Sequence, residues 1–320
     1  MVPYLETTFP VKQFYDDEET VAYWVDLPPW PEHWLVQPGD DLGRLSYAEG
    51  WGIPAHDVNW AQRSASRLLV PLNGTEQEMT FQAYAPRGGQ QLGMKINGQV
   101  LEPLVMSAGW MDYEVSIPAS LVHKGLNEIW LHFETLYSAS HVRLSPRSIG
   151  ATGFESPLNL VVQSAGQEVG DFGHVYVNGQ NVSLNQRGYN IAVLHPETGD
   201  VEQIAAFDTH LDEGASQALA SFLTNIPSGR IVAVVAADDA SRLLGQEAQA
   251  ALQGIGATGD LRDRFRWGHA IIGIRGASPG TALETMDWMR PVALVVGEGA
   301  TEPRLAAAFA TIRFTARSHH

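Results

Sequence analysis

The segment 187–200 constrains the fold of this chain more than any other stretch, because it reads as a strand, a tight turn and the start of a returning strand. Residues 189–194 are apolar and partly β-branched, which is typical of a buried strand. Pro196 fixes φ for a turn, and Gly199 provides the backbone freedom that closes it. Residues 201–207 then run back. The segment therefore predicts a β-hairpin around which the C-terminal half of the chain is organised.

A regular order of helix and strand follows this hairpin. The apolar residues of 213–226 recur at i, i+3, i+4, i+7, i+8 and i+11, which places them on one face of a helix. Asp212 is the expected N-cap of that helix. The uncharged apolar runs 231–236 and 269–274 predict buried strands, with a second helix between them. Two further strands are expected at 158–164 and 174–182. These elements predict an α+β domain.

The pattern from 46 to 150 is all-β. Pro71 confines one strand to a sheet edge or ends it early, and Asn97-Gly98 is a strong hairpin signal. The phrase 124–131 resembles the late strands of galactose-binding-like jelly rolls, so this region is expected to be a jelly-roll sandwich. Jelly rolls of this kind serve as carbohydrate-binding modules or as spacers. The candidate strands are 66–72, 78–85, 93–100, 112–117 and 128–134.

Both ends of the chain are harder to interpret. Residues 1–45 are expected to form an arm in which the charge run 16–19 starts a solvated helix. Its aromatic side chains either pack on the following domain or form a platform that stacks on sugar. Two apolar runs in 285–320, at 291–296 and 310–315, are expected to complete a sheet whose partner the sequence does not identify. The aromatic residues of the arm are Tyr15, Tyr23, Trp24, Trp30 and Trp34.

Composition excludes several classes of protein. The 320 residues suffice for two domains, and the net charge of −16 argues against binding to a nucleic-acid backbone. No apolar run approaches the length of a membrane span, and the N-terminus does not read as a signal peptide. The chain has no cysteine, which excludes disulfides and thiolate chemistry. We therefore expect an acidic two-domain protein without a membrane span in this chain.

Four short phrases indicate a family for residues 157–284. They are Arg187-Gly188-Tyr189-Asn190, Phe207-Asp208-Thr209, the acidic turn 237–241, and Phe265-Arg266 followed by 270–276. Their order and spacing resemble the interleukin-like EMT-inducer domain, which occurs in secreted cytokine-like proteins and in the stem of the O-mannose N-acetylglucosaminyltransferase. The resemblance implies a non-catalytic α+β domain of antiparallel sheets flanked by helices. It also favours an extracytoplasmic or cell-surface location.

The resemblance implies a sugar site as well. Stem-type members bind sugar through an Arg, an Asp and a second Arg, and these correspond to Arg187, Asp238 and Arg266. A guanidinium fork and a carboxylate are suited to hydroxyl and acetamide groups. Two residues depart from the family pattern: Trp267 stands where the family usually has an acid, and His269 stands where it commonly has an aromatic residue. The alternatives are that Arg187 and Asp238 form a structural ion pair, that Asp238 or Asp239 caps a helix, and that Arg266 is a solvated surface residue.

The sequence contains no motif of catalysis or cofactor binding. A nucleophile elbow, a phosphate-binding loop and a dinucleotide fingerprint are all missing, and the histidines lack metal-ligand spacing. We expect no cofactor, no metal and no enzymatic activity. The expected function is a carbohydrate-binding or cell-surface recognition module whose partner is a glycan, such as an N-acetylglucosamine-like sugar. The alternatives are a protein-interaction or signalling domain and an unrecognised hydrolase. The jelly roll could instead carry the sugar site, through Trp51, Trp60 or Trp110.

Overall fold

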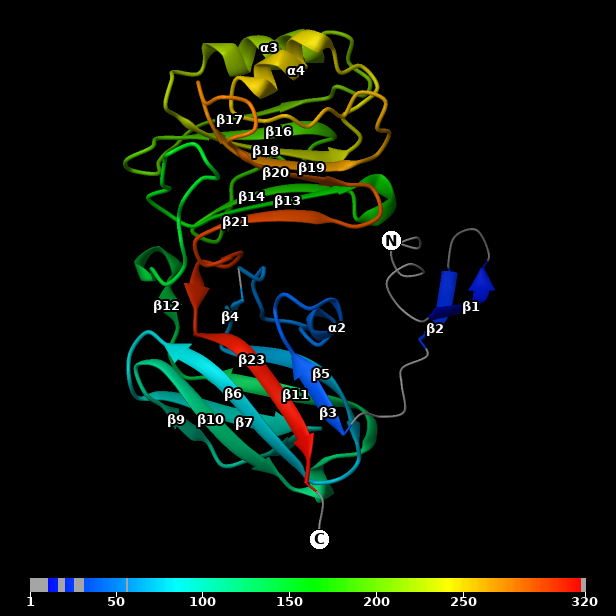
Figure 1. The fold of residues 1–320 in the computed structure, drawn as a ribbon, viewed down its shortest axis with the longest axis vertical. Coiled ribbons are helices and arrows are strands. Elements are labelled where there is room, and N and C mark those ends of the chain that lie inside the picture. Colours follow the sequence, from blue (N-terminus) through cyan, green and yellow to red (C-terminus); the bar gives the residue numbers. More distant parts are fainter. Residues whose placement is uncertain (1–10, 17–20, 26–31, 56, 318–320) are drawn as a thin grey trace. The chain divides into compact units, whose positions relative to one another are not determined.

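The computed structural model describes residues 11–16, 21–25, 32–55 and 57–317, and the chain divides into two compact units (Figure 1). The sandwich unit comprises Leu27–Leu144 and Glu298–His320. The three-layer unit comprises Ser145–Gly297 together with Met1–Asp26. In the sequence, the main part of the three-layer unit is therefore an insertion between two parts of the sandwich unit.

Two five-stranded antiparallel sheets form the sandwich unit. The first sheet has the order β10-β6-β23-β3, with β4 also paired to β23, and the second has the order β5-β11-β7-β8, with β9 also paired to β7. A short helix, α2 (Asp41–Arg44), and a two-stranded pair, β12 (Tyr137–Ser138) with β22 (Arg304–Leu305), complete the unit. The strands of the first sheet are β3 (His33–Val36), β4 (Asn59–Ala61), β6 (Gln77–Ala85), β10 (Gly109–Ile117) and β23 (Ala307–Ala316). Those of the second are β5 (Ala65–Asn73), β7 (Gln90–Ile96), β8 (Gln99–Val100), β9 (Leu104–Met106) and β11 (Lys124–Phe133).

Alternating side chains build the core between these two sheets. Along β6 and β11 every second residue is buried, as expected for strands that cover a core on one face only. Pro71 lies in β5, at the edge of its sheet, where its missing N–H is tolerated. Asn97 and Gly98 both have positive φ and connect β7 to β8 as a hairpin turn. The largest core side chains include Leu68, Met79, Ile129, Phe309 and Phe314.

The three-layer unit stacks two helices on a central sheet and that sheet on an outer one (Figure 1). The central sheet has the order β17-β16-β18-β19-β20, and the outer sheet has the order β15-β14-β13-β21. Strands β13 and β18 join the two sheets through a short parallel contact at Gly166 and Asp238. The central strands are β16 (Gly188–Leu194), β17 (Val201–Phe207), β18 (Ile231–Asp238), β19 (Gly268–Ile274) and β20 (Leu283–Asp287). The outer strands are β13 (Leu160–Gly166), β14 (Phe172–Val177), β15 (Gln180–Asn181) and β21 (Val292–Val296), and the helices are α3 (Ala215–Asn225) and α4 (Gln246–Gln253).

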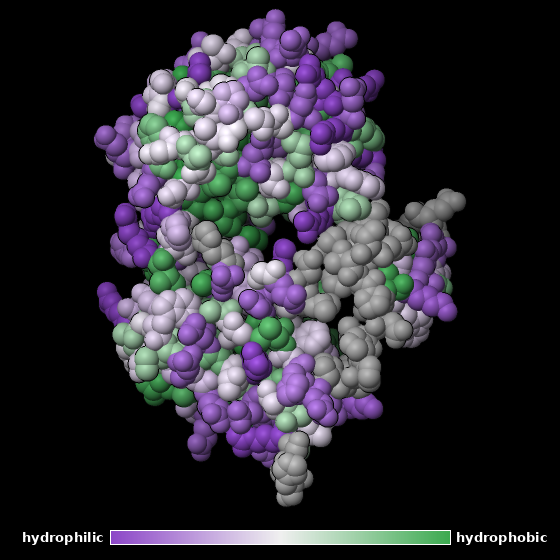
Figure 2. Space-filling view, viewed as in Figure 1, coloured by the Kyte–Doolittle hydropathy of each residue, from purple (hydrophilic) through white to green (hydrophobic). Residues whose placement is uncertain are grey.

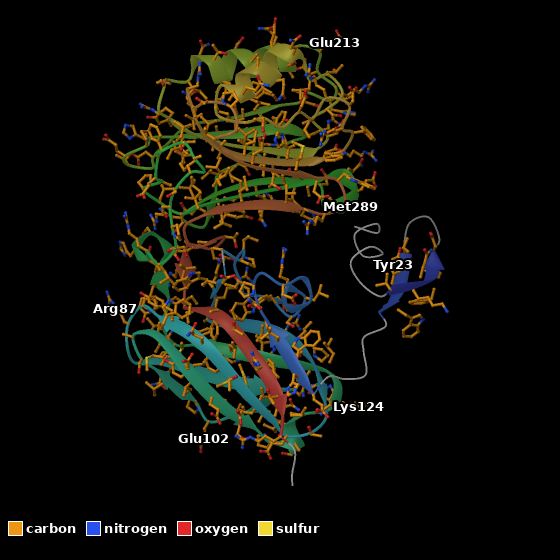
Figure 3. The ribbon with its side chains drawn as sticks, in the orientation of Figure 1. Tyr23, Arg87, Glu102, Lys124, Glu213 and Met289 are labelled. Atoms are coloured by element: carbon orange, nitrogen blue, oxygen red, sulfur yellow. The ribbon has the colours of Figure 1, made fainter. Side chains whose placement is uncertain are left out.

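Because the central sheet is covered on both faces, its inner strands are largely apolar along their whole length. Every residue of β16 and β19 is buried. Val234 faces the helices, whereas Val235 faces the outer sheet. Side chains fill the space between the layers of each unit (Figure 3). The prediction of a jelly-roll sandwich combined with an α+β domain of antiparallel sheets and flanking helices is confirmed.

The space-filling view shows that apolar surface gathers over β21, whereas the helical layer is largely hydrophilic (Figure 2). In the described part of the chain, no helix combines the length and apolarity that crossing a bilayer demands. The N-terminal strands β1 (Val11–Asp16) and β2 (Val21–Val25) pair as an antiparallel hairpin. Asp16 therefore ends a strand and does not start a helix. The remainder of the charge run at 17–19 lies outside the described residues.

Several boundaries differ from those expected from the sequence. The two C-terminal runs are sheet strands, as predicted, but they belong to different units: β21 pairs with β13, and β23 pairs with β6, β3 and β4. The sandwich is therefore not a contiguous 46–150 domain. Helix α3 begins at Ala215 after Gly214, and Asp212 is not its N-cap, because its carboxylate accepts the Gly214 N–H at 2.8 Å instead. Of the arm aromatics, Trp34 packs on the sandwich core, Tyr15 and Trp24 are exposed, and Trp30 lies outside the described residues.

Candidate functional site

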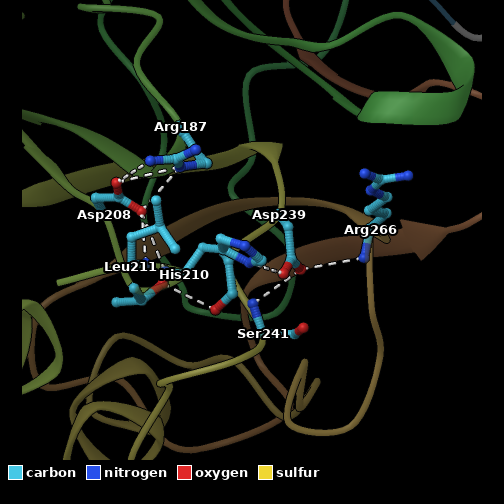
Figure 4. A network of polar contacts seen from close by, with 9 residues as sticks. Arg187, Asp208, His210, Leu211, Asp239, Ser241 and Arg266 are labelled. Carbon is cyan, nitrogen blue, oxygen red and sulfur yellow. Dashed lines mark hydrogen bonds and ion pairs between the residues drawn. The ribbon is translucent and has the colours of Figure 1, made fainter. Parts of the chain in front are cut away.

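The three residues expected to bind sugar lie at one end of the central sheet of the three-layer unit. Arg187 immediately precedes β16, Asp238 is the last residue of β18, and Arg266 lies two residues before β19. Gly188 pairs with Ala237 across β16 and β18, and the antiparallel pairing of β18 with β19 brings the end of the one to the start of the other. The topology therefore gathers the three residues. We call this end of the sheet the rim, and it also includes Asp208, His210 and Asp239 (Figure 4) and Phe265, whose ring lies next to that of His210.

Arg187 is held by Asp208, which lies just after β17. Its Nη2 donates to Asp208 Oδ2 at 2.7 Å, and its Nε donates to both carboxylate oxygens at 3.1 Å. The hydrogen bond from Arg187 lowers the pKa of the Asp208 carboxyl below its usual value, and burial opposes this only in part. Asp208 also accepts the backbone N–H groups of His210 and Leu211, so it orders the turn after β17. The ion-pair partner of Arg187 is therefore Asp208 and not Asp238.

Asp239 joins three segments of the rim (Figure 4). Its side chain is 1% exposed, and its carboxylate accepts the backbone N–H groups of Ser241 at 3.0 Å and Arg266 at 3.1 Å and contacts His210 Nδ1 at 2.5 Å. Burial raises the pKa of Asp239, but these hydrogen bonds outweigh burial and lower the pKa. Because α4 begins only at Gln246, neither Asp238 nor Asp239 is a helix N-cap. Asp239 instead fixes Arg266 against the acidic turn.

Asp238 presents a carboxylate that forms no hydrogen bond or ion pair within the part of the chain that the structure describes. Its φ of 56° lies in the left-handed region, where aspartate is among the few tolerated side chains. Burial raises its pKa, and the charge of Asp171 adds to this shift, whereas Arg187, Arg266 and His210 act in the opposite direction. Asp238 is therefore within electrostatic range of both predicted arginines while its acceptor capacity remains available.

Arg266 and Phe265 form the outer part of the rim. The Arg266 guanidinium forms an ion pair with Glu168 and lies over the Phe265 ring, 4.7 Å from its centroid. Phe265 is 57% exposed, and its ring lies 6.1 Å from that of His210. Arg266 is therefore a partly exposed residue, and it is not merely solvated. Phe265 is not among the site residues predicted from the sequence, although an aromatic residue in a charged loop indicates a surface contact.

A buried chain of three polar side chains lies beside the rim. Tyr189 Oη contacts His269 Nδ1 at 3.0 Å, and His269 Nε2 contacts Glu284 Oε1 at 2.8 Å. Burial raises the pKa of Glu284, but hydrogen bonds from His269 and from the N–H groups of Thr258 and Gly259 outweigh burial and lower the pKa to about 2. Glu284 therefore accepts as a carboxylate, and His269, which departs from the family pattern, has an internal partner.

The sandwich unit places its tryptophans differently from what sugar stacking requires. Trp60 is fully buried and donates to Glu298 at 3.1 Å, and Trp51 packs edge-on against Phe309 and donates to the Arg67 carbonyl at 2.8 Å. Of the three candidates, Trp110 alone is partly exposed on the outer face of its sheet, and its ring packs against Tyr84. Within the described ranges, no group of three or more His, Asp and Glu residues is arranged to hold a metal ion.

Comparison with known proteins agrees with the sequence phrases. Residues 187–277 match the family model of the interleukin-like EMT inducer. This match confirms the predicted resemblance for residues 187–277. It is 30% identical over 102 residues to the human cell migration-inducing and hyaluronan-binding protein, and 32% identical over 101 residues to the cell surface hyaluronidase of Danio rerio. These matches cover 32% and 31% of this chain, and the chain spans only 7% of the length of each of these relatives.

Solved structures resemble parts of the chain at low similarity. A CBM36-1 domain of a xylanase from the hindgut metagenome of Trinervitermes trinervoides is 11% identical, with a TM-score of 0.23, over 31% of this chain and 82% of that one. A β-glucuronidase from Ruminococcus gnavus is 8% identical, with a TM-score of 0.20, over 83% of this chain and 45% of that one. Similarities of this size support no inference about activity.

Proposed function

We propose that the rim binds the end of an uncharged glycan that carries an N-acetylglucosamine-like sugar, and that it does so without turnover. The observation that carries the proposal is the convergence of Arg187, Asp238 and Arg266 at one end of the sheet, with the Asp238 carboxylate unpartnered and Phe265 exposed. The carboxylate accepts hydroxyl hydrogens, and the Phe265 ring offers a flat apolar surface to the face of a sugar ring.

The charge of the rim favours an uncharged ligand. The relatives named above include a hyaluronan-binding protein, and hyaluronan combines N-acetylglucosamine with a carboxylate-bearing sugar. Around Asp238 lie Asp171, Asp208, Asp239 and Glu168, against the two arginines Arg187 and Arg266. Both arginines are engaged by internal carboxylates. An N-acetylated sugar therefore suits the rim, whereas a second sugar that carries a carboxylate is repelled.

The absence of turnover rests on how the rim carboxylates are engaged. Glycoside hydrolysis uses two carboxyl groups on opposite sides of the scissile bond. Asp208 is held by Arg187 and two backbone N–H groups, and Asp239 is held by three donors, so neither is available as an acid or a base. Of the remaining carboxylates near the rim, Glu168 is paired with Arg266, so a hydrolase would have to use Asp171 and Asp238, whose charges act on each other. Hydrolysis of an N-acetylglucosamine oligosaccharide that ceases in Asp171→Asn would therefore overturn this part of the proposal.

Calorimetric titration of the full chain with chitotriose and with hyaluronan oligosaccharides tests the rim. We expect binding of chitotriose at about −4 to −8 kcal/mol, which corresponds to millimolar to micromolar affinity. Asp238→Ala removes the open acceptor and should cost about 1–3 kcal/mol of that binding. Glu213→Ala, which removes the same charge from the exposed loop before α3, is the matched control (Figure 3).

Two results would contradict the proposal. In the first, Asp238→Ala binds chitotriose as the unmodified chain does, so that the rim is not the site. In the second, hyaluronan binds more tightly than chitotriose, so that the charge argument is wrong. A glycan array without any signal would instead favour the alternative function, in which the exposed Phe265 contacts a protein partner.

A further inference from the structure

The first sheet of the sandwich unit carries a groove of about 460 Å³ on its outer face. This volume falls within the range that small-molecule sites usually have. The side chains that line it come from three adjacent strands, β10, β6 and β23. We call it the sandwich groove, and its polar lining consists of Thr80, Gln82, Asp112, Glu114, Thr311 and Arg313.

The strand register arranges these six side chains as two parallel rows. One row is Asp112, Gln82 and Thr311, and the other is Glu114, Thr80 and Arg313. Adjacent strands lie about 4.8 Å apart and alternate residues along a strand about 7 Å apart, so the rows form a grid of roughly 7 by 10 Å. A grid of this size offers hydrogen-bonding groups to one or two sugar rings that lie flat on the sheet.

An irregularity in β23 is what turns its part of the grid outward. Phe309 points into the core, and in a regular strand Thr311 would do the same, because side chains two apart share a face. The register shifts between Phe309 and Thr311, so that Ala310 is an extra residue. After it, Ile312 and Phe314 face the core, whereas Thr311 and Arg313 line the groove. Bulges that re-aim side chains in this way are common beside binding sites.

The groove contains hydrogen-bonding groups that the protein itself does not use. Among the described residues, the Arg313 guanidinium has neither a hydrogen bond nor an ion pair, and the hydroxyls of Thr80 and Thr311 likewise have no protein partner. Arg317 of the same face is, by contrast, paired with Glu76, Glu78 and Glu114. A planar guanidinium next to carboxylates and hydroxyls suits the neighbouring hydroxyl groups of a saccharide.

An aromatic pair lies at one end of the same face. Trp110 and Tyr84 are cross-strand partners two residues before Asp112 and two after Gln82, and their ring centroids lie 5.7 Å apart. Both residues are partly exposed. Because alternate residues of a strand point to the same side, both rings lie on the groove's side of the sheet, where they also pack against the buried cluster that contains Trp60. They offer an apolar surface next to the polar grid, which is the combination that a sugar ring with one apolar face requires.

We propose that the sandwich groove is a second binding site and that its ligand is an uncharged oligosaccharide. The lining contains two carboxylates, Asp112 and Glu114, against one guanidinium, Arg313, so it does not attract a polyanion. The site shares no residue with the rim. The proposal therefore does not depend on the function proposed for the rim.

The test uses the full chain with Asp238→Ala, in which binding at the rim is weakened. Calorimetric titrations with cello-, xylo-, manno- and chito-oligosaccharides should find at least one ligand that still binds. Adding Arg313→Ala should weaken that binding about tenfold, because it removes a charged hydrogen-bond donor. Asp112→Asn should weaken it as well. Arg87→Ala, in the exposed turn between β6 and β7, is the matched control and should change nothing (Figure 3).

The outcomes separate the two sites. If no uncharged oligosaccharide binds the Asp238→Ala chain, or if Arg313→Ala binds as strongly as the Arg87→Ala control, the groove is not a binding site. Binding that disappears with Asp238→Ala alone assigns all recognition to the rim. Arg313 is exposed, so unchanged circular dichroism and an unchanged unfolding midpoint should accompany the loss of binding.

Discussion

The two units differ in how their sequence reaches their fold. Most of the three-layer unit comes from the continuous stretch 145–297, whereas the sandwich unit is closed by β23, which follows that whole stretch. The two units also differ in whether their exposed arginines have partners within the protein. At the rim the arginines are paired internally, with Asp208 and Glu168, whereas Arg313 in the sandwich groove has no partner among the described residues. The rim is thus preorganised by its own contacts, whereas the groove contains a guanidinium without a protein partner that is open to a ligand.

Removing β23 should produce the largest difference in stability between the two units. Deletion of residues 306–320 takes away the strand between β6 and β3 and the core side chains Phe309, Ile312 and Phe314. Each of these is worth about 2–5 kcal/mol, so their sum of about 6–15 kcal/mol is as large as the whole stability of an ordinary domain. We expect the sandwich unit to unfold while the three-layer unit keeps its core.

Hydrogen exchange with mass spectrometry measures this directly. Protection should be lost in β6, β11 and β7 and retained in β16, β18 and β19. Deletion of residues 318–320 alone is the control. If the sandwich strands stay protected without β23, that strand does not hold the sandwich unit together. If both units lose protection, the three-layer unit does not keep its core independently.

The same difference explains what the sequence could predict. Strands β16 to β19 and helix α3 follow one another in short order, and their periodicity identified them within about two residues at each end. The turn at Asn97-Gly98 could be predicted equally well, and both residues adopt positive φ. Pairing between β23 and β6 joins residues more than 200 positions apart, and no local pattern encodes such a partner.

For a related reason, the sequence predicts where the residues of the candidate site lie but not which side chains they contact. The positions of Arg187, Asp238 and Arg266 follow from short phrases at strand ends, so their gathering could be predicted. Their partners could not. Whether Arg187 meets Asp208 or Asp238 depends on side-chain direction at the rim, where Asp238 has a positive φ that turns its carboxylate away from an ordinary strand end.

The buried pair of His269 and Glu284 should act on the three-layer unit alone. The pKa of Glu284 is lowered from a usual value near 4.5 to about 2, and its side chain is 14% exposed. A lowered pKa means that the stabilisation is complete above pH 4.5 and is lost as the pH falls towards 2. The size is about 3 kcal/mol, at 1.36 kcal/mol for each unit of pKa.

Glu284→Gln tests this contribution to stability. The amide nitrogen would replace one of the two oxygens that accept the N–H groups of Thr258 and Gly259, so one of these hydrogen bonds would be lost. The free energy of unfolding of the three-layer unit, from urea titrations, should differ between the two chains at pH 7 and converge by about pH 2. Glu213→Gln, on the exposed loop before α3, should track the unmodified chain at every pH. A difference that stays constant from pH 7 to pH 2 would show that Glu284 is not the titrating group.

The smallest effect on stability should come from Phe265→Ala. This substitution tests whether a rim side chain stabilises the fold or is exposed in order to contact a ligand. Phe265 is 57% exposed, so its truncation should change the free energy of unfolding by no more than about 0.5 kcal/mol. Its ring nonetheless carries the Arg266 guanidinium, and it is the flat surface of the rim. Binding of chitotriose should therefore weaken by about 0.5–1.5 kcal/mol, as expected for a lost aromatic contact. Phe265→Tyr keeps the ring and should restore binding. A stability loss above about 2 kcal/mol would mean that Phe265 supports the rim as core, and that its exposure is not reserved for a ligand.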